Sequence, residues 1–403
     1  MFKQEWKKRG WKRLGAFFGA GEIPVPYVMP KSKDLERGRP ITPFTKHYLR
    51  SLYRRAGRAH SCRVKNMLPT STFNITACSE FKCRVAAGVA AGRDRYGDSL
   101  AWVGVIGDLA NMYTELRHKD IEDAVEWETR RPGKRRRADR VAVHRRRRET
   151  HLGRCYGADW VEVMTRDIEE VSAFDNRNLF VYIRGTVVRQ CHGCPMGSHL
   201  SPPKAVICCS PPEAVLINLM TALDLVYIAC RFMDDVFLYV AYDLKSEASW
   251  RNADSVVQRA RGMYPAPLLL ECDDGPWPKK YLESDVHMVG GDFLIRQHVY
   301  NRDCVCTGQQ RKRLIYHQDT DRQLVQQTLM GDFHRARFCS NYPAGLLCSA
   351  LWRSLDFMLG GHPLKAAAAA AKAVAKNGSL DPEWACIWDM LKELAKLTAR
   401  CQN

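Results

Sequence analysis

Acidic residues are scarce in this sequence relative to basic ones. The 403 residues include 44 Asp and Glu against 62 Lys and Arg, which gives a formal net charge of +18 at pH 7. An excess of this size favours a polyanionic partner and binding that weakens as salt is raised. A ribosomal protein or a protein of the membrane surface could be equally basic, so charge alone leaves these classes open.

Long apolar runs are also lacking. The longest extends from Ala214 to Cys230 and is interrupted by Asn218, Thr221 and Asp224. Such a run is too short and too polar for a membrane span, so we expect a buried helix and strand here and no membrane partner. Lys and Arg interrupt every early apolar stretch, which does not fit a signal peptide. A hydrophobic share of 46% with 10% aromatics predicts a folded globular chain.

The 16 cysteines are scattered, and several fall in apolar runs. This usage predicts reduced, buried thiols in an intracellular protein. Residues 191–194, Cys-His-Gly-Cys, have the spacing of metal ligands. A structural zinc site needs four ligands, and no second pair stands at a suitable spacing, so we expect no zinc.

Two adjacent carboxylates, Asp234 and Asp235, lie between two apolar, β-prone runs at 228–232 and 236–242. This pattern predicts a tight β-hairpin with the Asp pair at its tip. Neighbouring like charges repel unless a cation neutralises them, and sites of phosphoryl transfer use such carboxylates to hold two divalent ions. Because most Asp-Asp pairs are solvated turns, the interpretation depends on further motifs upstream.

Asp108 supplies a third carboxylate. It ends the apolar run 102–107 and precedes a segment rich in helix formers, so we expect it at a strand-to-helix turn. Tyr113 follows five residues later, where its ring would lie beneath the sugar of a bound nucleotide and exclude a ribose 2′-hydroxyl. The structural alternative is a helix N-cap at Asp108 and a core aromatic at Tyr113.

A loop rich in Gly and Pro occupies 190–205, between these two motifs. Ser201 followed by Pro202 predicts the start of a helix, since Pro is tolerated in the first helical turn. Gly197 would let the backbone approach a base pair closely. Residues 180–190 precede the loop and predict a hairpin with its turn at a glycine, Gly185.

Together these motifs resemble the palm of reverse transcriptases. The resemblance rests on the Pro-Met-Gly-Ser-x-Leu-Ser-Pro loop at 195–202, the Phe-Met-Asp-Asp turn at 232–235 and the Asp108 turn, in that order along the chain. One departure is Phe232, where the family usually has Tyr. Looser matches extend the resemblance to about residues 20–365, and there the sequence is most similar to Penelope-like and telomerase-related retroelement enzymes.

The resemblance implies an α+β right-hand polymerase, with fingers, a palm built on an antiparallel sheet, and a helical thumb. The implied parts are a basic N-terminal segment at 1–22, fingers at 23–100, a palm at 101–300 with a basic insertion at 130–150, and a thumb at 301–403. Within the palm range we also expect a helix over 154–176.

The implied activity is RNA-directed DNA synthesis from dNTPs on an RNA or DNA template with a DNA primer. Asp108, Asp234 and Asp235 would bind two Mg²⁺ ions, or Mn²⁺ in their place, with Asp234 more essential than Asp235. The residues implied to contact the dNTP are Lys31, Lys33, Arg39, Tyr113, Met196 and Gly197. Two alternatives remain open: an RNA-dependent RNA polymerase, and a domesticated nucleic-acid-binding protein without catalysis.

A dense basic run fills 130–148, with eleven Lys and Arg against one acid, Asp139. Like charges at this density are not expected to pack into a core, so the run predicts an exposed loop or helix. Three interpretations are compatible with the run: a nuclear import signal, a solvated insertion, and a contact with the template backbone. The template contact would use Arg135, Arg136, Arg137, Arg145 and Arg146. We therefore expect an intracellular protein, with the nucleus and an organelle both compatible.

Overall fold

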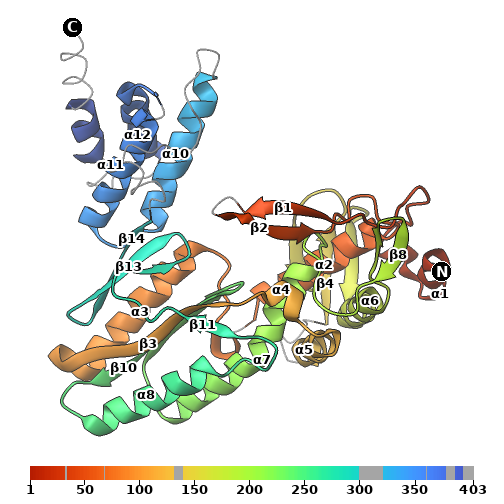
Figure 1. The fold of residues 1–403 in the computed structure, drawn as a ribbon, viewed down its shortest axis with the longest axis horizontal. Coiled ribbons are helices and arrows are strands. Elements are labelled where there is room, and N and C mark those ends of the chain that lie inside the picture. Colours follow the sequence, from red (N-terminus) through yellow and green to blue (C-terminus); the bar gives the residue numbers. More distant parts are fainter. Residues whose placement is uncertain are drawn as a thin grey trace.

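The computed structural model describes residues 1–31, 34–67, 69–130, 139–298, 321–359, 361–377 and 386–393. Within them the chain is a mixed α+β protein with several small antiparallel sheets, which confirms the predicted α+β class. Figure 1 shows an N-terminal lobe, a central sheet with its covering helices, and a group of C-terminal helices.

The central sheet contains β11 (Leu270–Cys272), β3 (Leu100–Leu109), β10 (Asp235–Asp243) and β9 (Tyr227–Phe232) in that order, all antiparallel. Side chains of β10 alternate between its two faces, as strand geometry requires. Val236 and Leu238 belong to the core that includes helices α7 (Ser201–Ala222) and α8 (Glu247–Arg261). Phe237 and Tyr239 belong to the core on the other face, which includes α3 (Cys78–Tyr96). Both faces are therefore buried.

Helix α7 combines length with apolar character. It is the one helix among the described residues whose length and composition would allow a membrane span, and 61% of that window is buried inside the fold. Core helices pass the same test, so this is weak evidence for a span. The succession of α7 and β9 confirms the buried helix and strand predicted for Ala214–Cys230.

A second sheet connects the central sheet to the C-terminal helices. It contains β12 (Lys279–Tyr281), β13 (Ser284–Val289) and β14 (Asp292–Gln297), and the helices are α10 (Arg322–Phe338), α11 (Pro343–Leu359) and α12 (Leu364–Asn377). Asn341, between α10 and α11, exchanges backbone and side-chain hydrogen bonds of 2.7–3.0 Å with Ile295 and Phe293 of β14. These bonds fix the helices against the sheet.

The N-terminal lobe surrounds α2 (Arg50–Lys65). Its other helices are α1 (Phe2–Lys8), α4 (Met112–Glu115), α5 (His118–Arg130) and α6 (Thr165–Arg177), and its hairpins are β1–β2 (Tyr27–Lys31, Asp34–Ile41) and β7–β8 (Phe180–Ile183, Thr186–Arg189). The β1–β2 hairpin projects from the lobe on the side of the C-terminal helices (Figure 1). The predicted hairpin at 180–190 is confirmed, with Gly185 at φ +84° in its turn.

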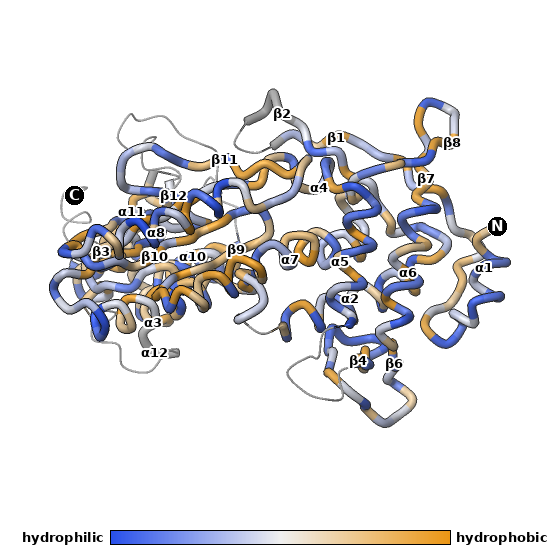
Figure 2. Tube along the Cα trace, turned by 90° about the horizontal axis from the view of Figure 1, so that it is seen from below, coloured by the Kyte–Doolittle hydropathy of each residue, from blue (hydrophilic) through white to orange (hydrophobic). Residues whose placement is uncertain are grey.

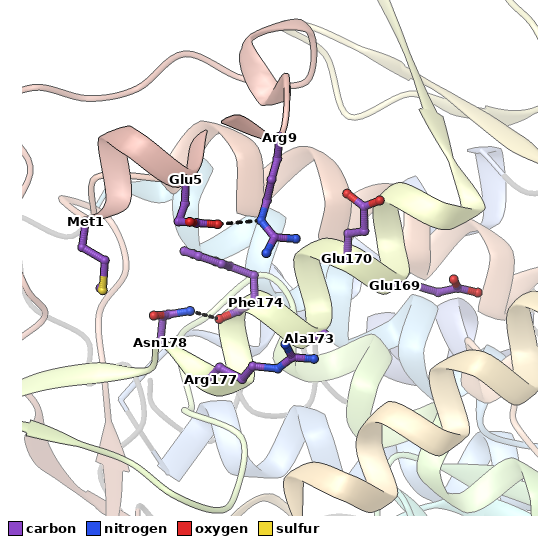
Figure 3. Close-up of a pocket in the computed structure, with 9 residues that line it drawn as sticks. All are labelled: Met1, Glu5, Arg9, Glu169, Glu170, Ala173, Phe174, Arg177 and Asn178. Carbon is purple, nitrogen blue, oxygen red and sulfur yellow. Dashed lines mark hydrogen bonds and ion pairs between the residues drawn. The ribbon is translucent and has the colours of Figure 1, made fainter. Parts of the chain in front are cut away.

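The basic N-terminal segment packs onto α6. Trp11 and Leu14 are fully buried, and the Trp6 indole donates a hydrogen bond of 2.8 Å to the Gly15 carbonyl oxygen. A cavity of about 530 Å³ lies between α1 and α6, where Arg9 bonds Glu5 at 2.9 Å (Figure 3). The aromatic residues thus anchor a segment whose charges face outward.

Two predictions about residues 130–176 are wrong in part, although the helix over 165–176 and the exposed turn with Arg145–Arg148 are confirmed. A three-stranded sheet, β5-β4-β6 (Thr150–Leu152, Arg140–His144, Trp160–Met164), stands where we expected an exposed loop or helix followed by a helix from 154. Val141 and Val143 are fully buried, and helix α6 begins only at Thr165. The consecutive apolar residues Val141, Ala142 and Val143 inside the basic run decide the structure, because all three are fully buried while Arg145–Arg148 remain exposed. Residues 131–138, with Arg135, Arg136 and Arg137, lie outside the described residues.

Helix α3 packs on the central sheet, where Phe81 and Val85 share a core with Phe237 of β10. The expected range 23–100 places this helix in the fingers, and that domain division stays a prediction. The sequence of α3 indicates a helix with a buried face, while the layer that covers this face is decided by tertiary packing.

Candidate active site

The Phe-Met-Asp-Asp motif forms the turn between β9 and β10. Phe232 pairs with Asp235, so Met233 and Asp234 form the turn itself, with Met233 at φ +59°. Both aspartates are half-buried. The predicted hairpin with the Asp pair at its tip is confirmed.

Asp108 lies next to this turn in the central sheet. It is the cross-strand partner of Asp235, and the Leu109 backbone N–H donates to the Asp234 carbonyl oxygen at 2.9 Å. Directly opposed residues of an antiparallel pair share one sheet face. The two strands therefore bring Asp108 and Asp235 to the same face, although these residues lie 127 positions apart in the sequence.

Glu271 of β11 is a carboxylate that sequence reasoning did not assign to the site. It is the cross-strand partner of Asp108 on the side away from β10, so Glu271, Asp108 and Asp235 form a row across three strands. The only sequence signal is an acid at the end of the apolar run 268–270. Within the described residues, no group of three or more His, Cys, Asp or Glu is gathered closely enough to hold a metal ion.

A buried ion pair supports the turn from below. Arg231 of β9 and Glu213 of α7 are fully buried and form an ion pair. Arg231 also donates hydrogen bonds to the carbonyl oxygens of Met233 and Val206, both at 2.9 Å. Glu213 accepts further bonds from the hydroxyl groups of Thr72 (2.9 Å) and Tyr264 (3.0 Å). Each buried charge thus has several partners, which burial requires. The turn that carries Asp234 is thereby held to the core.

Tyr113 lies in α4, directly after β3. Its backbone carbonyl accepts the Cys194 N–H at 2.6 Å. Burial, and then the nearby Cys194 and Asp234, raise the pKa of the Tyr113 hydroxyl above its ordinary value. The Tyr113 ring is half-buried, and Asp234 is among the charges that act on its hydroxyl.

The glycine-rich loop joins the Tyr113 turn to the β1–β2 hairpin. Gly193 N–H donates to the Leu116 carbonyl at 2.7 Å, and Thr42 N–H donates to the Met196 carbonyl at 2.7 Å. Gly197 has φ +121°, and a Cβ there would lie 2.4 Å from the Thr42 carbonyl oxygen. Only glycine fits such a contact. Met196 and Gly197 are therefore fixed between the hairpin and α7.

The structure places the remaining predicted residues as follows. Arg39 is exposed on β2 opposite Met29, in the hairpin whose base contacts Met196. Lys31 ends β1, and its side chain lies outside the described residues, as does Lys33 entirely. Arg145 and Arg146 are exposed in the turn after β4, and Figure 2 places β4 well away from β9 and β10. Arg145 and Arg146 are thus separate from the carboxylates.

A cavity of about 730 Å³ opens beside Asp235. Residues of the β12–β13 turn, Leu282 and Glu283, form one wall, and His334 and Arg335 of α10 form another. Arg335 pairs with Glu283 at 3.2 Å across its edge. The cavity thus connects the carboxylates to the C-terminal helices.

No family model matches this sequence, and no curated protein matches it. Among solved structures, apo telomerase from Candida tropicalis is similar in fold, with a TM-score of 0.50 and 10% sequence identity over 96% of this chain and 64% of that chain. Telomerase from Candida albicans, in complex with a TWJ fragment of telomeric RNA, has a TM-score of 0.49 and 10% identity over 97% of this chain and 70% of that chain. At such identity the likeness concerns the fold alone.

Proposed function

We propose that this protein is an RNA-directed DNA polymerase of reverse-transcriptase type, related in fold to telomerase. The observation that carries the proposal is the register of β3 and β10, which sets Asp108 opposite Asp235 at a Phe-Met-Asp-Asp turn. A backbone hydrogen bond joins this turn to Leu109, next to Asp108, and another joins Tyr113 to Cys194 of the glycine-rich loop. The family resemblance assigns Asp108 to metal, Tyr113 to sugar and Met196–Gly197 to the base pair.

The donor set fits divalent magnesium. Asp108, Asp234 and Asp235 offer only oxygen ligands, which Mg²⁺ and Mn²⁺ prefer, and two of the three share one sheet face. When bound, two such ions would activate a primer 3′-hydroxyl and stabilise the leaving pyrophosphate. The protein's own contribution would be to present these carboxylates from neighbouring strands, with Arg231 and Glu213 fixing the turn that carries Asp234.

Substrate selection falls to the residues around the carboxylates. The Tyr113 ring would exclude a ribose 2′-hydroxyl and admit a deoxyribose. Met196 and Gly197 would lie against the templating base pair, in a loop that the close contact of Gly197 with the Thr42 carbonyl oxygen fixes in place. Arg39, with Lys31 or Lys33, would neutralise the triphosphate from the β1–β2 hairpin.

In this proposal the N-terminal lobe corresponds to fingers, the central sheet to the palm and the C-terminal helices to the thumb. The RNA template and DNA primer would lie between them, with the primer end near the cavity that Asp235, Glu283 and Arg335 line. The net charge of +18 supports a nucleic-acid partner of this kind.

Primer extension tests the proposal directly. Matched RNA and DNA templates with a DNA primer are incubated with Mg²⁺ and either dNTPs or rNTPs, and wild type is compared with Asp234→Ala. We expect dNTP-dependent extension on RNA that the variant loses while its template affinity is retained. Extension by the variant would refute the catalytic assignment. Preference for rNTPs would indicate an RNA polymerase, and tight binding without extension a non-catalytic binding protein.

A further inference from the structure

A strip of arginines crosses the outer side of the N-terminal lobe. Arg50, Arg54 and Arg58 follow one another at four-residue intervals along α2, so they share one face of the helix. Next to Arg58 lies the turn between β4 and β5, which carries four consecutive exposed arginines, Arg145–Arg148. We call these seven residues the basic strip.

The β4–β5 turn is held in a defined shape. Arg58 donates to the carbonyl oxygens of His144 (3.0 Å), Arg147 (2.5 Å) and Glu149 (2.8 Å). The His144 Nδ1 accepts the backbone N–H groups of Arg146 and Arg147 at 3.2 and 2.9 Å. These bonds occupy backbone N–H and carbonyl groups of the turn, and its arginine side chains remain exposed. The turn therefore presents its positive charges on a fixed frame.

The charge of the strip is largely uncompensated. Among the described residues, Arg147 is its only member paired with a carboxylate, at 3.6 Å from Glu149. Burial, and then Arg145 and Arg54, lower the pKa of the neighbouring Arg55. Mutually repelling guanidinium groups with one carboxylate among them form a surface suited to a chain of negative charges.

An aromatic cavity lies at the other end of the strip. It has a volume of about 440 Å³ and is lined by Phe17, Phe18, Arg50, Arg54 and His199 among others. The Arg50 guanidinium lies 3.8 Å from the centre of the Phe18 ring. Aromatic and guanidinium faces are the groups on which unpaired bases stack. The cavity thus provides a site for a base beside the arginines that would bind phosphates.

The cavity adjoins the proposed templating loop. His199 is two residues after Gly197, and a Cβ on Gly57 of α2 would lie 2.2 Å from the His199 carbonyl oxygen. Helix α2 therefore packs directly against the loop, and the strip leads away from it toward the β4–β5 turn. A strand that leaves the loop would meet the cavity first and the arginines next.

We propose that the basic strip binds single-stranded RNA, with phosphates on the arginines and an unstacked base in the cavity near Phe18. The identification of this strand as the unpaired part of the template rests on the proposed function, whereas the binding itself does not. The aromatic cavity at the end of a linear track favours a nucleic-acid strand over an acidic protein or a membrane, since neither of these supplies a planar base.

Binding is tested on the full chain without Mg²⁺, so that catalysis plays no part. Fluorescence anisotropy measures the affinity for an unstructured RNA of about 15 nucleotides, a length within the usual range of single-strand sites. The variants are Arg146→Glu with Arg148→Glu, and separately Arg54→Glu. The matched control reverses two charges elsewhere, Lys245→Glu and Arg259→Glu. Both residues are exposed, the first just before α8 and the second within it.

Both strip variants should bind roughly tenfold more weakly and with a shallower salt dependence, while the control stays within about twofold. Unchanged affinity in the strip variants would overturn the proposal. So would equal binding of polyglutamate or of anionic lipid vesicles by the wild type, because the strip would then recognise charge alone. Thermal melts establish that each variant is folded.

A second experiment separates this inference from the proposed function. Primer extension is compared on templates with and without a long single-stranded 5′ extension. The strip variants should lose efficiency only on the extended template. Equal loss on both templates would remove the template assignment, whereas an absence of extension in wild type would count against the proposed function and leave the binding result standing.

Discussion

Asp108 on β3 is the cross-strand partner of Asp235 on β10, and the next backbone N–H, that of Leu109, bonds the Asp234 carbonyl oxygen. The sheet thereby brings together carboxylates from two distant segments before any cation is bound. Bringing like charges together costs free energy, and such arrangements are concentrated at functional sites. These carboxylates are therefore the first residues to mutate.

Asp108→Asn and Asp234→Asn should each reduce dNTP incorporation by roughly a thousandfold, since each removes a carboxylate that would hold a metal ion at the reacting centre. The family resemblance predicts a smaller loss for Asp235→Asn. Asp94→Asn, an exposed carboxylate on α3, is the matched control and should retain activity. Single-turnover extension rates measure the effect. A comparable loss in the control would show that the rate responds to the overall charge of the protein and not to these three carboxylates.

Tyr113→Val should increase the use of rNTPs relative to dNTPs, because the ring that would meet the 2′-hydroxyl is removed. Tyr113→Phe is the control: it keeps the ring and should keep the selectivity. The measurement is kcat/KM for one matched dNTP and rNTP pair, with an expected shift in their ratio of about tenfold or more. An unchanged ratio would rule out the steric role.

Gly197→Ala should impair extension more than stability. Its Cβ would lie 2.4 Å from the Thr42 carbonyl oxygen at φ +121°, so the loop must move away from the β1–β2 hairpin. Gly262→Ala, at φ −114° with no atom within 4 Å of the added Cβ, is the matched control. Extension rates and urea midpoints are compared, and wild-type activity in Gly197→Ala would refute the fixed-loop interpretation.

Arg231→Met should destabilise the fold by about 3–5 kcal/mol, because it leaves Glu213 buried without its cation. The double variant with Glu213→Leu should recover part of this loss, since the isolated charge is gone. Recovery stays incomplete because the Thr72 and Tyr264 hydroxyls lose their acceptor. Arg95→Met removes an exposed pair with Asp224 and should cost at most about 1 kcal/mol. Urea unfolding measures all four proteins.

Acid should destabilise the N-terminal lobe between about pH 6.5 and pH 4. Burial lowers the pKa of His47 to about 4, and its Nδ1 accepts the Leu49 backbone N–H at 3.1 Å. The folded pKa lies below the ordinary value of about 6.5, so the unfolded chain binds the proton first. The stabilising contribution is therefore complete above pH 6.5 and is lost as pH falls toward 4. His47→Asn should show a smaller drop in unfolding free energy between pH 7 and 5, and identical slopes would contradict this.

Local chemistry made several features predictable. The apolar runs around Asp234 and Asp235 specify a hairpin, and Gly185 and Gly197 occupy backbone conformations that favour glycine. Ser201 with Pro202 starts α7 as expected. These signals are carried by neighbouring residues, so they do not depend on the rest of the fold.

Other features depend on contacts that the linear pattern does not specify. The charge count around Arg140–Arg148 concealed the short apolar run Val141–Val143, which is buried where β4 pairs with β6. Glu271 enters the row of carboxylates only because β11 adds to the far edge of β3. The basic strip likewise exists because Arg58 of α2 bonds the β4–β5 turn across 86 to 91 positions of sequence.

The sequence by itself determined the elements and the chemistry of this protein: the α+β class, the Asp hairpin, the glycine loop and the excess of positive charge. Tertiary structure alone decided which elements became neighbours, and with them the register of Asp108 and Asp235, the face covered by α3 and the path of the basic strip. The physical reason is that turn geometry and hydrophobic periodicity are local, whereas strand pairing and layer packing are settled by competition among distant surfaces for burial.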